Sequence, residues 1–324
     1  MRKHLLTTLA LFVCAAAHAA PCDTKMGKNA PSPLLYSAFT GNTANVRCLL
    51  DSGVDVNAAL GKNATTALMV AAGEGHLDTV RLLIERGATV DAATAEVGIT
   101  ALMAAASEGH LDTVRLLIEK GANAGAVANN GGSPLMFAAA KGHTDIARLL
   151  IEKGANVGAA TAEAGVTALM AAASNGHTDT ARLLLEKGAD VNAADKNGIT
   201  ALLAATMGGH SDTARLLIEK GANVSAAANN GITPLTLTAA QKHTDINLAR
   251  LLIEKGANVD ATSKGGNSAL VTATRMGHTD LVRLLIEKGA DVNATDKNGT
   301  TALGIAQAKG HTAIADMLRA AGAK

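Results

Sequence analysis

The chain has 324 residues, and its 29 lysines and arginines nearly balance its 28 aspartates and glutamates. This balance argues against a nucleic-acid-binding protein, since such a protein needs a surface with excess positive charge. Hydrophobic residues make up 48% of the chain, which excludes a largely disordered protein, but aromatic residues make up only 1% and tryptophan is absent. We therefore expect a thin aliphatic core of many small stacked helices, which disfavours a compact multilayered enzyme.

Residues 1–19 have the pattern of a secretory signal peptide. Arg2 and Lys3 precede an apolar stretch over residues 5–17, and Ala17 and Ala19 mark a cleavage site after residue 19. The apolar stretch is shorter than the roughly 20 residues that a membrane span needs. We therefore predict a periplasmic or secreted protein that starts with a lead-in segment over residues 20–30 and has no membrane insertion after signal cleavage.

Two cysteines, Cys22 and Cys48, follow the predicted cleavage site. In an oxidising compartment they could form a disulfide between the lead-in segment and the first helices, worth about 3 kcal/mol on the loop-entropy model. The alternative is that Cys48, within the apolar run over residues 46–50, is only a small core residue. The sequence leaves both alternatives open.

Residues 31–324 consist of similar segments that repeat every 33 to 35 residues. In each segment a small hydroxyl residue begins an apolar run. The nine hydroxyl residues are Ser32, Thr66, Thr100, Ser133, Thr167, Thr200, Thr233, Ser268 and Thr301. Self-similarity at this period is typical of a solenoid, in which each unit buries its apolar face only against its neighbours. We predict one solenoid domain of nine units over residues 31–324.

Each unit predicts two short helices joined by a turn. In the third unit Thr100 is placed to cap a first helix, and Gly109 ends it. Asp112 then lies where a carboxylate favours the N-terminus of a second helix. Asn-Gly pairs between units, such as residues 197–198, predict tight turns, so we expect projecting, hairpin-like fingers there.

The sequence resembles the ankyrin-repeat family over about residues 30–324, as a bacterial, exported member. The strings that carry the resemblance recur with few changes and include residues 188–192, 195–202, 209–210 and 214–218. The resemblance implies an all-α repeat solenoid of about nine helix-turn-helix units joined by β-hairpin-like fingers. It also implies a protein partner bound on the concave side.

Two departures from the family pattern stand out. The family's Thr-Pro-Leu-His is mostly Thr-Ala-Leu-Met here, so a capping hydrogen bond made by that histidine in the family is replaced by apolar contact in most units. In unit seven Lys242 replaces the turn glycine, and the segment from His243 to Arg250 is two residues longer than its counterparts. We expect a lengthened turn, which is either a hinge or partner-specific feature or a tolerated surface insertion.

Eight histidines recur at one place in the units, but we predict that they are turn residues. Packed helices lie about 8–10 Å apart, too far for successive imidazoles to share a metal ion. These residues are His76, His110, His143, His177, His210, His243, His278 and His311. The sequence also has no unique acid or base, no nucleophile elbow and no phosphate loop. We therefore predict no catalytic residues, no metal site and no cofactor, and a protein that is not an enzyme.

Candidate partner-binding residues are those that vary between units. They are the finger residue before each capping hydroxyl and the last turn of each first helix. We select Ile99, Glu108, Val166, Asn175, Ile199, Met207, Ile232, Gln241, Arg275 and Met276. The β-branched members of this set would form an exposed apolar stripe. The alternative is that they pack against the neighbouring finger.

These observations predict a monomeric, non-catalytic protein–protein interaction scaffold that is exported and binds a protein partner through the concave groove and fingers. One alternative is an exported effector or accessory that stabilises or sequesters a periplasmic enzyme. Another is a structural module without a specific partner. The near-identity of some fingers, such as residues 129–131 and 229–231, is compatible with this last alternative.

Overall fold

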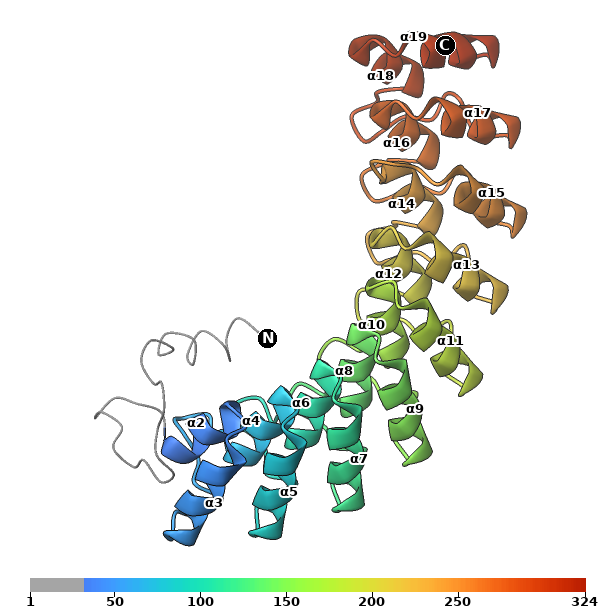
Figure 1. Ribbon diagram of the computed structural model, residues 1–324. Coiled ribbons are helices and arrows are strands. Elements are labelled where there is room, and N and C mark those ends of the chain that lie inside the picture. The colour runs from blue at the N-terminus through green and yellow to red at the C-terminus, as the bar shows by residue number, and fades with distance from the viewer. Residues whose placement is uncertain (1–31) are drawn as a thin grey trace. The chain divides into compact units, whose positions relative to one another are not determined.

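The structure is a computed structural model that describes residues 32–324, so the predicted signal peptide and lead-in segment lie outside the described residues. The chain forms two compact units with a boundary between residues 156 and 157. The described part of the N-terminal unit contains four helix pairs, and the C-terminal unit contains five (Figure 1). We number these pairs as repeats one to nine.

The helices are short and alternate between the first and second member of each repeat. In the N-terminal unit they are α2 (Pro33–Phe39), α3 (Thr43–Asp51), α4 (Ala67–Glu74), α5 (Leu77–Glu85), α6 (Ala101–Glu108), α7 (Leu111–Glu119), α8 (Pro134–Lys141) and α9 (Thr144–Glu152). In the C-terminal unit they are α10 (Ala168–Ser174), α11 (Thr178–Glu186), α12 (Ala201–Met207), α13 (Ser211–Glu219), α14 (Pro234–Ala240), α15 (Ile246–Glu254), α16 (Ala269–Met276), α17 (Thr279–Glu287), α18 (Ala302–Lys309) and α19 (Thr312–Ala320).

The recurring hydroxyl residues cap the first helices. Thr100 Oγ1, for example, accepts a hydrogen bond from the backbone N–H of Met103 at 3.3 Å. The predicted caps are confirmed in repeats two to nine, whereas the side chain of Ser32 makes no capping hydrogen bond. In repeat seven Thr236 stands where the family has histidine, and its Oγ1 accepts from the backbone N–H of Thr233 at 2.9 Å. This reciprocal bond completes a capping box.

Within each unit the first helices of successive repeats pack side by side, and so do the second helices (Figure 1). Leu102 and Ala105 on α6 and Leu117 on α7 are at most 1% exposed, and the equivalent leucines and alanines of other repeats are similarly buried. Alanine side chains let neighbouring helices approach closely, so a core nearly without aromatic rings can still be well packed. The prediction of a thin aliphatic core is confirmed for the described repeats.

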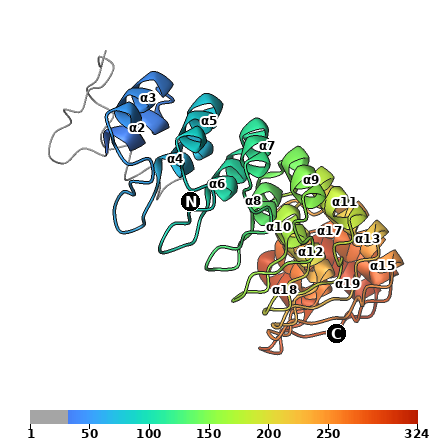
Figure 2. The same cartoon turned by 90° about the horizontal axis from the view of Figure 1, so that it is seen from below.

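The loops between repeats project away from the two helix layers as fingers (Figure 2). Neighbouring fingers are joined by backbone hydrogen bonds, such as Asn129 N–H to Val97 O in the N-terminal unit and Asn229 N–H to Asn197 O in the C-terminal unit, both at 2.8 Å. Isolated antiparallel bridges close several fingers, for example between Ala194 and Thr200. These bonds satisfy loop backbone groups and hold each finger in register with the next.

Candidate functional site

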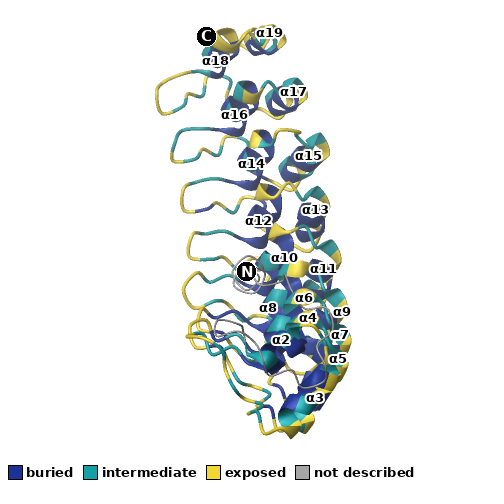
Figure 3. Ribbon diagram, turned by 60° about the vertical axis from the view of Figure 1, so that its left-hand side comes forward, coloured by how far each residue is buried: buried dark blue, intermediate teal, exposed yellow. Residues whose placement is uncertain are grey.

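Exposed apolar side chains gather on one kind of surface in the described part of the chain. Val97 and Val127 lie on fingers and are 36% and 63% exposed, and Met207 and Met276 end the first helices α12 and α16 and are 55% and 45% exposed. Figure 3 shows that the fingers consist largely of exposed and intermediate residues. In residues 32–324 no second helix carries a large hydrophobic side chain that is as exposed. We call the fingers and the last turns of the first helices of each unit its finger surface.

Several predicted partner-binding residues are accessible on this surface. Met207 and Met276 are two of the four large apolar side chains that are exposed in residues 32–324. Glu108, at the end of α6, and Asn175, which follows α10, are exposed as well. The Asn175 amide also donates to the carbonyl of Ala171 at 2.9 Å, so part of its hydrogen-bonding capacity is used within its own helix.

The predicted β-branched stripe is less exposed than a free surface would be. Its four side chains are half-buried at the base of their fingers, namely Ile99, Val166, Ile199 and Ile232. Their backbone N–H groups are also held, as in Ile99 N–H to Thr94 Oγ1 at 2.8 Å and Ile199 N–H to Asp195 Oδ1 at 2.7 Å. These residues therefore contribute to finger structure and leave only part of each side chain for a partner.

Two other predicted binding residues make structural contacts. The Gln241 amide donates to the carbonyl of Thr206 in the preceding repeat at 2.9 Å. Arg275 donates to Asn267 at 2.8 Å and to the Asp296 carboxylate at 3.2 Å. The pKa of Asp296 is lowered, chiefly because the backbone N–H of Thr300 donates to its carboxylate, with Arg275 adding a favourable positive charge. Arg275 thus links a first helix to two successive fingers.

Sequence reasoning missed the exposed valines Val97 and Val127. Val97 precedes Gly98, at the finger position where repeat six has Asn197 before Gly198, and both glycines have φ of +76°. A β-branched residue at a turn position that carries asparagine in four other fingers is a local signal that would have identified Val97. Val127 lies on the next finger, where the sequence gives no comparable signal.

The recurring histidines hold repeats together. The Nε2 atoms of His76, His110 and His210 lie 2.9, 3.0 and 3.2 Å from the backbone carbonyl oxygens of Phe39, Gly73 and Ser174 in the preceding repeats. Because a carbonyl oxygen only accepts, Nε2 must carry the proton. Each of these histidines also precedes a second helix, so the prediction of turn residues is confirmed for them. In repeat nine the buried Nε2 of His311 has no hydrogen-bond partner among the described residues.

Groups of three or more potential metal-binding side chains are not found between residues 32 and 324. Among the described helices, none is long and apolar enough to cross a membrane.

Cys48 is disulfide-bonded. Its predicted partner, Cys22, lies outside the described residues.

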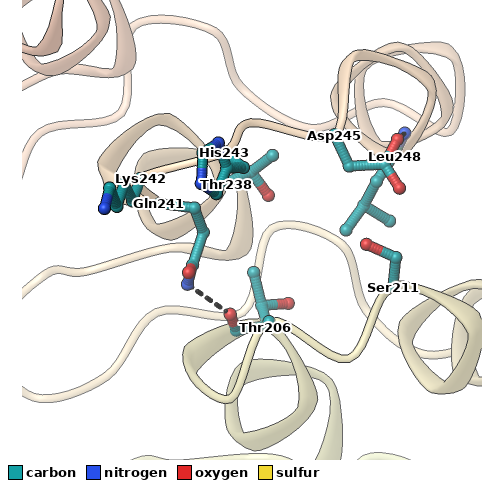
Figure 4. Close-up of a pocket in the computed structure, with 9 residues that line it drawn as sticks. Thr206, Ser211, Thr238, Gln241, Lys242, His243, Asp245 and Leu248 are labelled. Atoms are coloured by element: carbon teal, nitrogen blue, oxygen red, sulfur yellow. Dashed lines mark hydrogen bonds between the residues drawn. The ribbon is translucent and has the colours of Figure 1, made fainter.

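Repeat seven differs from the other repeats at the turn between its two helices. α14 ends at Ala240 and α15 begins at Ile246, and Asp245 caps α15 by accepting from the backbone N–H of Leu248 at 3.0 Å. The predicted lengthened turn is therefore confirmed. Beside it lies a cavity of about 170 Å³, with Thr206 and Ser211 of repeat six on one side and Gln241, Asp245 and Leu248 of repeat seven on the other (Figure 4).

The carboxylate in this cavity is neutralised by neighbouring groups. Burial by itself would raise the pKa of Asp245, but hydrogen bonds from Leu248 N–H and the Ser211 hydroxyl, together with the Arg215 guanidinium, lower it. Arg215 forms an ion pair with Asp245 and a second one with Asp212 at 3.0 Å. Asp245 is therefore ionised and paired at neutral pH.

The helix pairs, the fingers and the histidine turns define a helical-repeat protein whose repeats share one backbone scaffold. The family model described as ankyrin repeats (3 copies) matches residues 3–94, 90–161, 158–228 and 239–324. The chain belongs to the ankyrin-repeat family, whose members are generally protein–protein interaction modules. The prediction of an all-α repeat solenoid is confirmed. A search of curated proteins finds no match to this chain.

Proposed function

We propose that this protein is an exported, non-catalytic scaffold that binds a protein partner through its finger surface. The observation that carries the proposal is that all four exposed large apolar side chains in residues 32–324 lie on fingers or at the ends of first helices. When a partner covers exposed apolar side chains, the removal of their surface from water favours binding. The outward faces of the second helices carry charged residues instead, such as Asp112 and Arg115 on α7.

Site-specific photocrosslinking in the native host tests this surface. A photoreactive phenylalanine analogue replaces Met207 or Met276, and the control replaces Arg182, an exposed residue on the second helix α11. We expect the two finger-surface positions to trap the same polypeptide and the control position to trap none of it. Equal trapping at all three positions, or no trapped polypeptide at either methionine, would overturn the proposed surface.

Export forms part of the proposal because of the sequence pattern over residues 1–19. We expect the mature chain to begin at Ala20 and to be recovered from the periplasm or the medium. Cell fractionation followed by N-terminal sequencing measures both properties. A cytoplasmic protein that retains Arg2 and Lys3 would refute export while leaving the partner-binding surface untouched.

We further propose that Cys22 pairs with Cys48 in the exported protein. Alkylation without reduction should leave both thiols unmodified, and mass spectrometry of peptides should recover a linked pair. Replacing Cys22 with serine should lower the free energy of unfolding by about 3 kcal/mol, because the loop is no longer closed in the unfolded chain. Two freely alkylated thiols in protein taken from the native compartment would exclude the bond.

A further inference from the structure

The turn of repeat seven exposes side chains whose counterparts in other repeats bond to the preceding repeat. In repeat six His210 Nε2 is bound to the carbonyl of repeat five. In repeat seven the Gln241 amide makes the corresponding inter-repeat hydrogen bond, and His243 is exposed, with no hydrogen bond to another described residue. Lys242 is likewise exposed and forms no ion pair within residues 32–324.

The backbone of this turn adds further unused donors. In repeat six the N–H groups of His210 and Ser211 donate to Ala205 and Gly209 at 2.9 and 3.2 Å. The N–H groups of Lys242, His243 and Thr244 have no acceptor among the described residues. In repeat six the two N–H groups therefore bond within their own repeat, whereas in repeat seven, with its two-residue insertion, several N–H groups of the turn have no acceptor among the described residues. Free donors at a surface favour a ligand that accepts hydrogen bonds.

One charged group beside the cavity remains available to pair with an acidic side chain. The carboxylates of Asp212 and Asp245 are both paired with Arg215. Arg215 and Lys242 together balance these two carboxylates, and Lys242 is the one of the four groups without an ion-pair partner in residues 32–324, so it can pair with a carboxylate of the partner. Bonds from a charged donor to a carboxylate are about twice as strong as bonds between neutral groups.

The size of the cavity favours a single side chain as the occupant. Its volume of about 170 Å³ is well below the roughly 300–1,000 Å³ of pockets that enclose a small-molecule ligand. The exposed Met207 directly follows Thr206, which lines the cavity. A partner segment with an acidic residue beside an apolar residue would match the donors of the turn and the Met207 side chain together.

We propose that the repeat-seven turn, residues 241–245, binds an aspartate or glutamate side chain of the protein partner while a neighbouring apolar residue of that partner packs on Met207. This inference rests on the proposed scaffold function and names the chemistry that the finger surface recognises in repeats six and seven. Lys242, His243 and the turn N–H groups donate to the carboxylate, and Asp245 stays paired with Arg215.

A random dodecapeptide library displayed on phage and selected on the full mature protein tests this inference. We expect selected peptides to be enriched in aspartate or glutamate next to an apolar residue. Synthetic copies of these peptides should bind the Lys242→Ser, His243→Ser double variant about tenfold more weakly, which matches the loss of one charged hydrogen bond. Lys309→Ser, which removes an exposed lysine at the end of α18, should leave their affinity unchanged.

A second variant removes the whole turn without relying on point substitutions. Residues 207–213 of repeat six replace residues 240–248, which deletes the insertion and restores the regular glycine-histidine turn. This variant should lose binding of the acidic peptides while its helical circular dichroism is retained. Selected peptides without acidic residues, or acidic peptides that bind both variants at full affinity, would overturn the inference and leave the scaffold function standing. Selection of no peptide by any variant would count against both.

Discussion

Repeats six and seven form the turn between their two helices with different residues. In repeat six Gly209 adopts φ of +73°, and His210 both precedes α13 and bonds to the carbonyl of Ser174 at 3.2 Å. In repeat seven no residue between α14 and α15 has positive φ, Asp245 takes over the cap, and the side chain of Gln241 reaches the carbonyl of Thr206 at 2.9 Å. An inter-repeat hydrogen bond is kept, although its donor has changed and its shortest contact is now to Thr206, one residue before Met207, whose carbonyl lies 3.5 Å from the Gln241 amide.

This comparison separates what the stack requires from what a partner can use. A donor to a carbonyl of the preceding repeat is present in both arrangements, because the last carbonyls of a first helix have no partner within that helix. The imidazole itself is dispensable once another side chain supplies that donor. Repeat seven thereby exposes His243 and Lys242 without breaking the stack.

The largest expected effect comes from two glycines with nearly the same backbone. Gly176 and Gly209 have φ of +72° and +73°, but a Cβ on Gly176 would lie 2.5 Å from His210 Nδ1, whereas on Gly209 the nearest atom would be Gln241 Oε1 at 3.5 Å. We expect Gly209→Ala to lower the free energy of unfolding by about 1–2 kcal/mol through backbone strain. Gly176→Ala should cost about 2–4 kcal/mol, because the clash adds to that strain.

Urea unfolding followed by circular dichroism measures this pair, since the chain has no tryptophan to report by fluorescence. Equal losses in the two variants would mean that the turn of repeat six yields as easily as that of repeat seven. The comparison between a histidine-filled and a histidine-free junction would then fail.

A smaller effect is expected when the histidines themselves are truncated. His210→Ala removes an inter-repeat hydrogen bond and should cost about 1–2 kcal/mol. His243→Ala should change stability by less than about 0.5 kcal/mol, because the exposed ring makes no hydrogen bond to another described residue. Gln241→Ala serves as the control that removes the substitute donor, and it should resemble His210→Ala. A costly His243→Ala variant would show that this ring supports the turn.

Most of the fold follows from the periodicity of the sequence. The capping hydroxyls, the two helices per repeat and the lengthened turn of repeat seven are local features with local signals. The candidate site was only partly predictable. The exposure of Met207 was expected. The replacement of an imidazole by the Gln241 amide as the inter-repeat donor depends on the distance between two repeats, which the sequence of one repeat does not specify. The partial burial of Ile199 also depends on how closely the fingers pack.

The smallest effect is a pH dependence confined to the repeat-seven turn. Folding lowers the pKa of Asp245 below its ordinary value of 3.8, so the stability that its carboxylate contributes is complete above that value. The contribution is lost as the pH falls through the lowered, folded-state pKa. Asp245→Asn keeps a residue able to cap α15 but removes the charge that pairs with Arg215.

We therefore expect Asp245→Asn to be less stable than the unmodified protein at pH 7. The difference should shrink as the pH falls below 3.8 and through the lowered folded-state pKa, because Asp245 is then protonated and both proteins are uncharged at this position. Unfolding midpoints in urea from pH 7 to pH 2.5 measure the difference. Asp280→Asn, which removes an exposed acidic residue from the first turn of α17, controls for the loss of one negative charge. If the Asp245→Asn and unmodified curves stayed parallel through this range, the ion pair with Arg215 would not stabilise the turn.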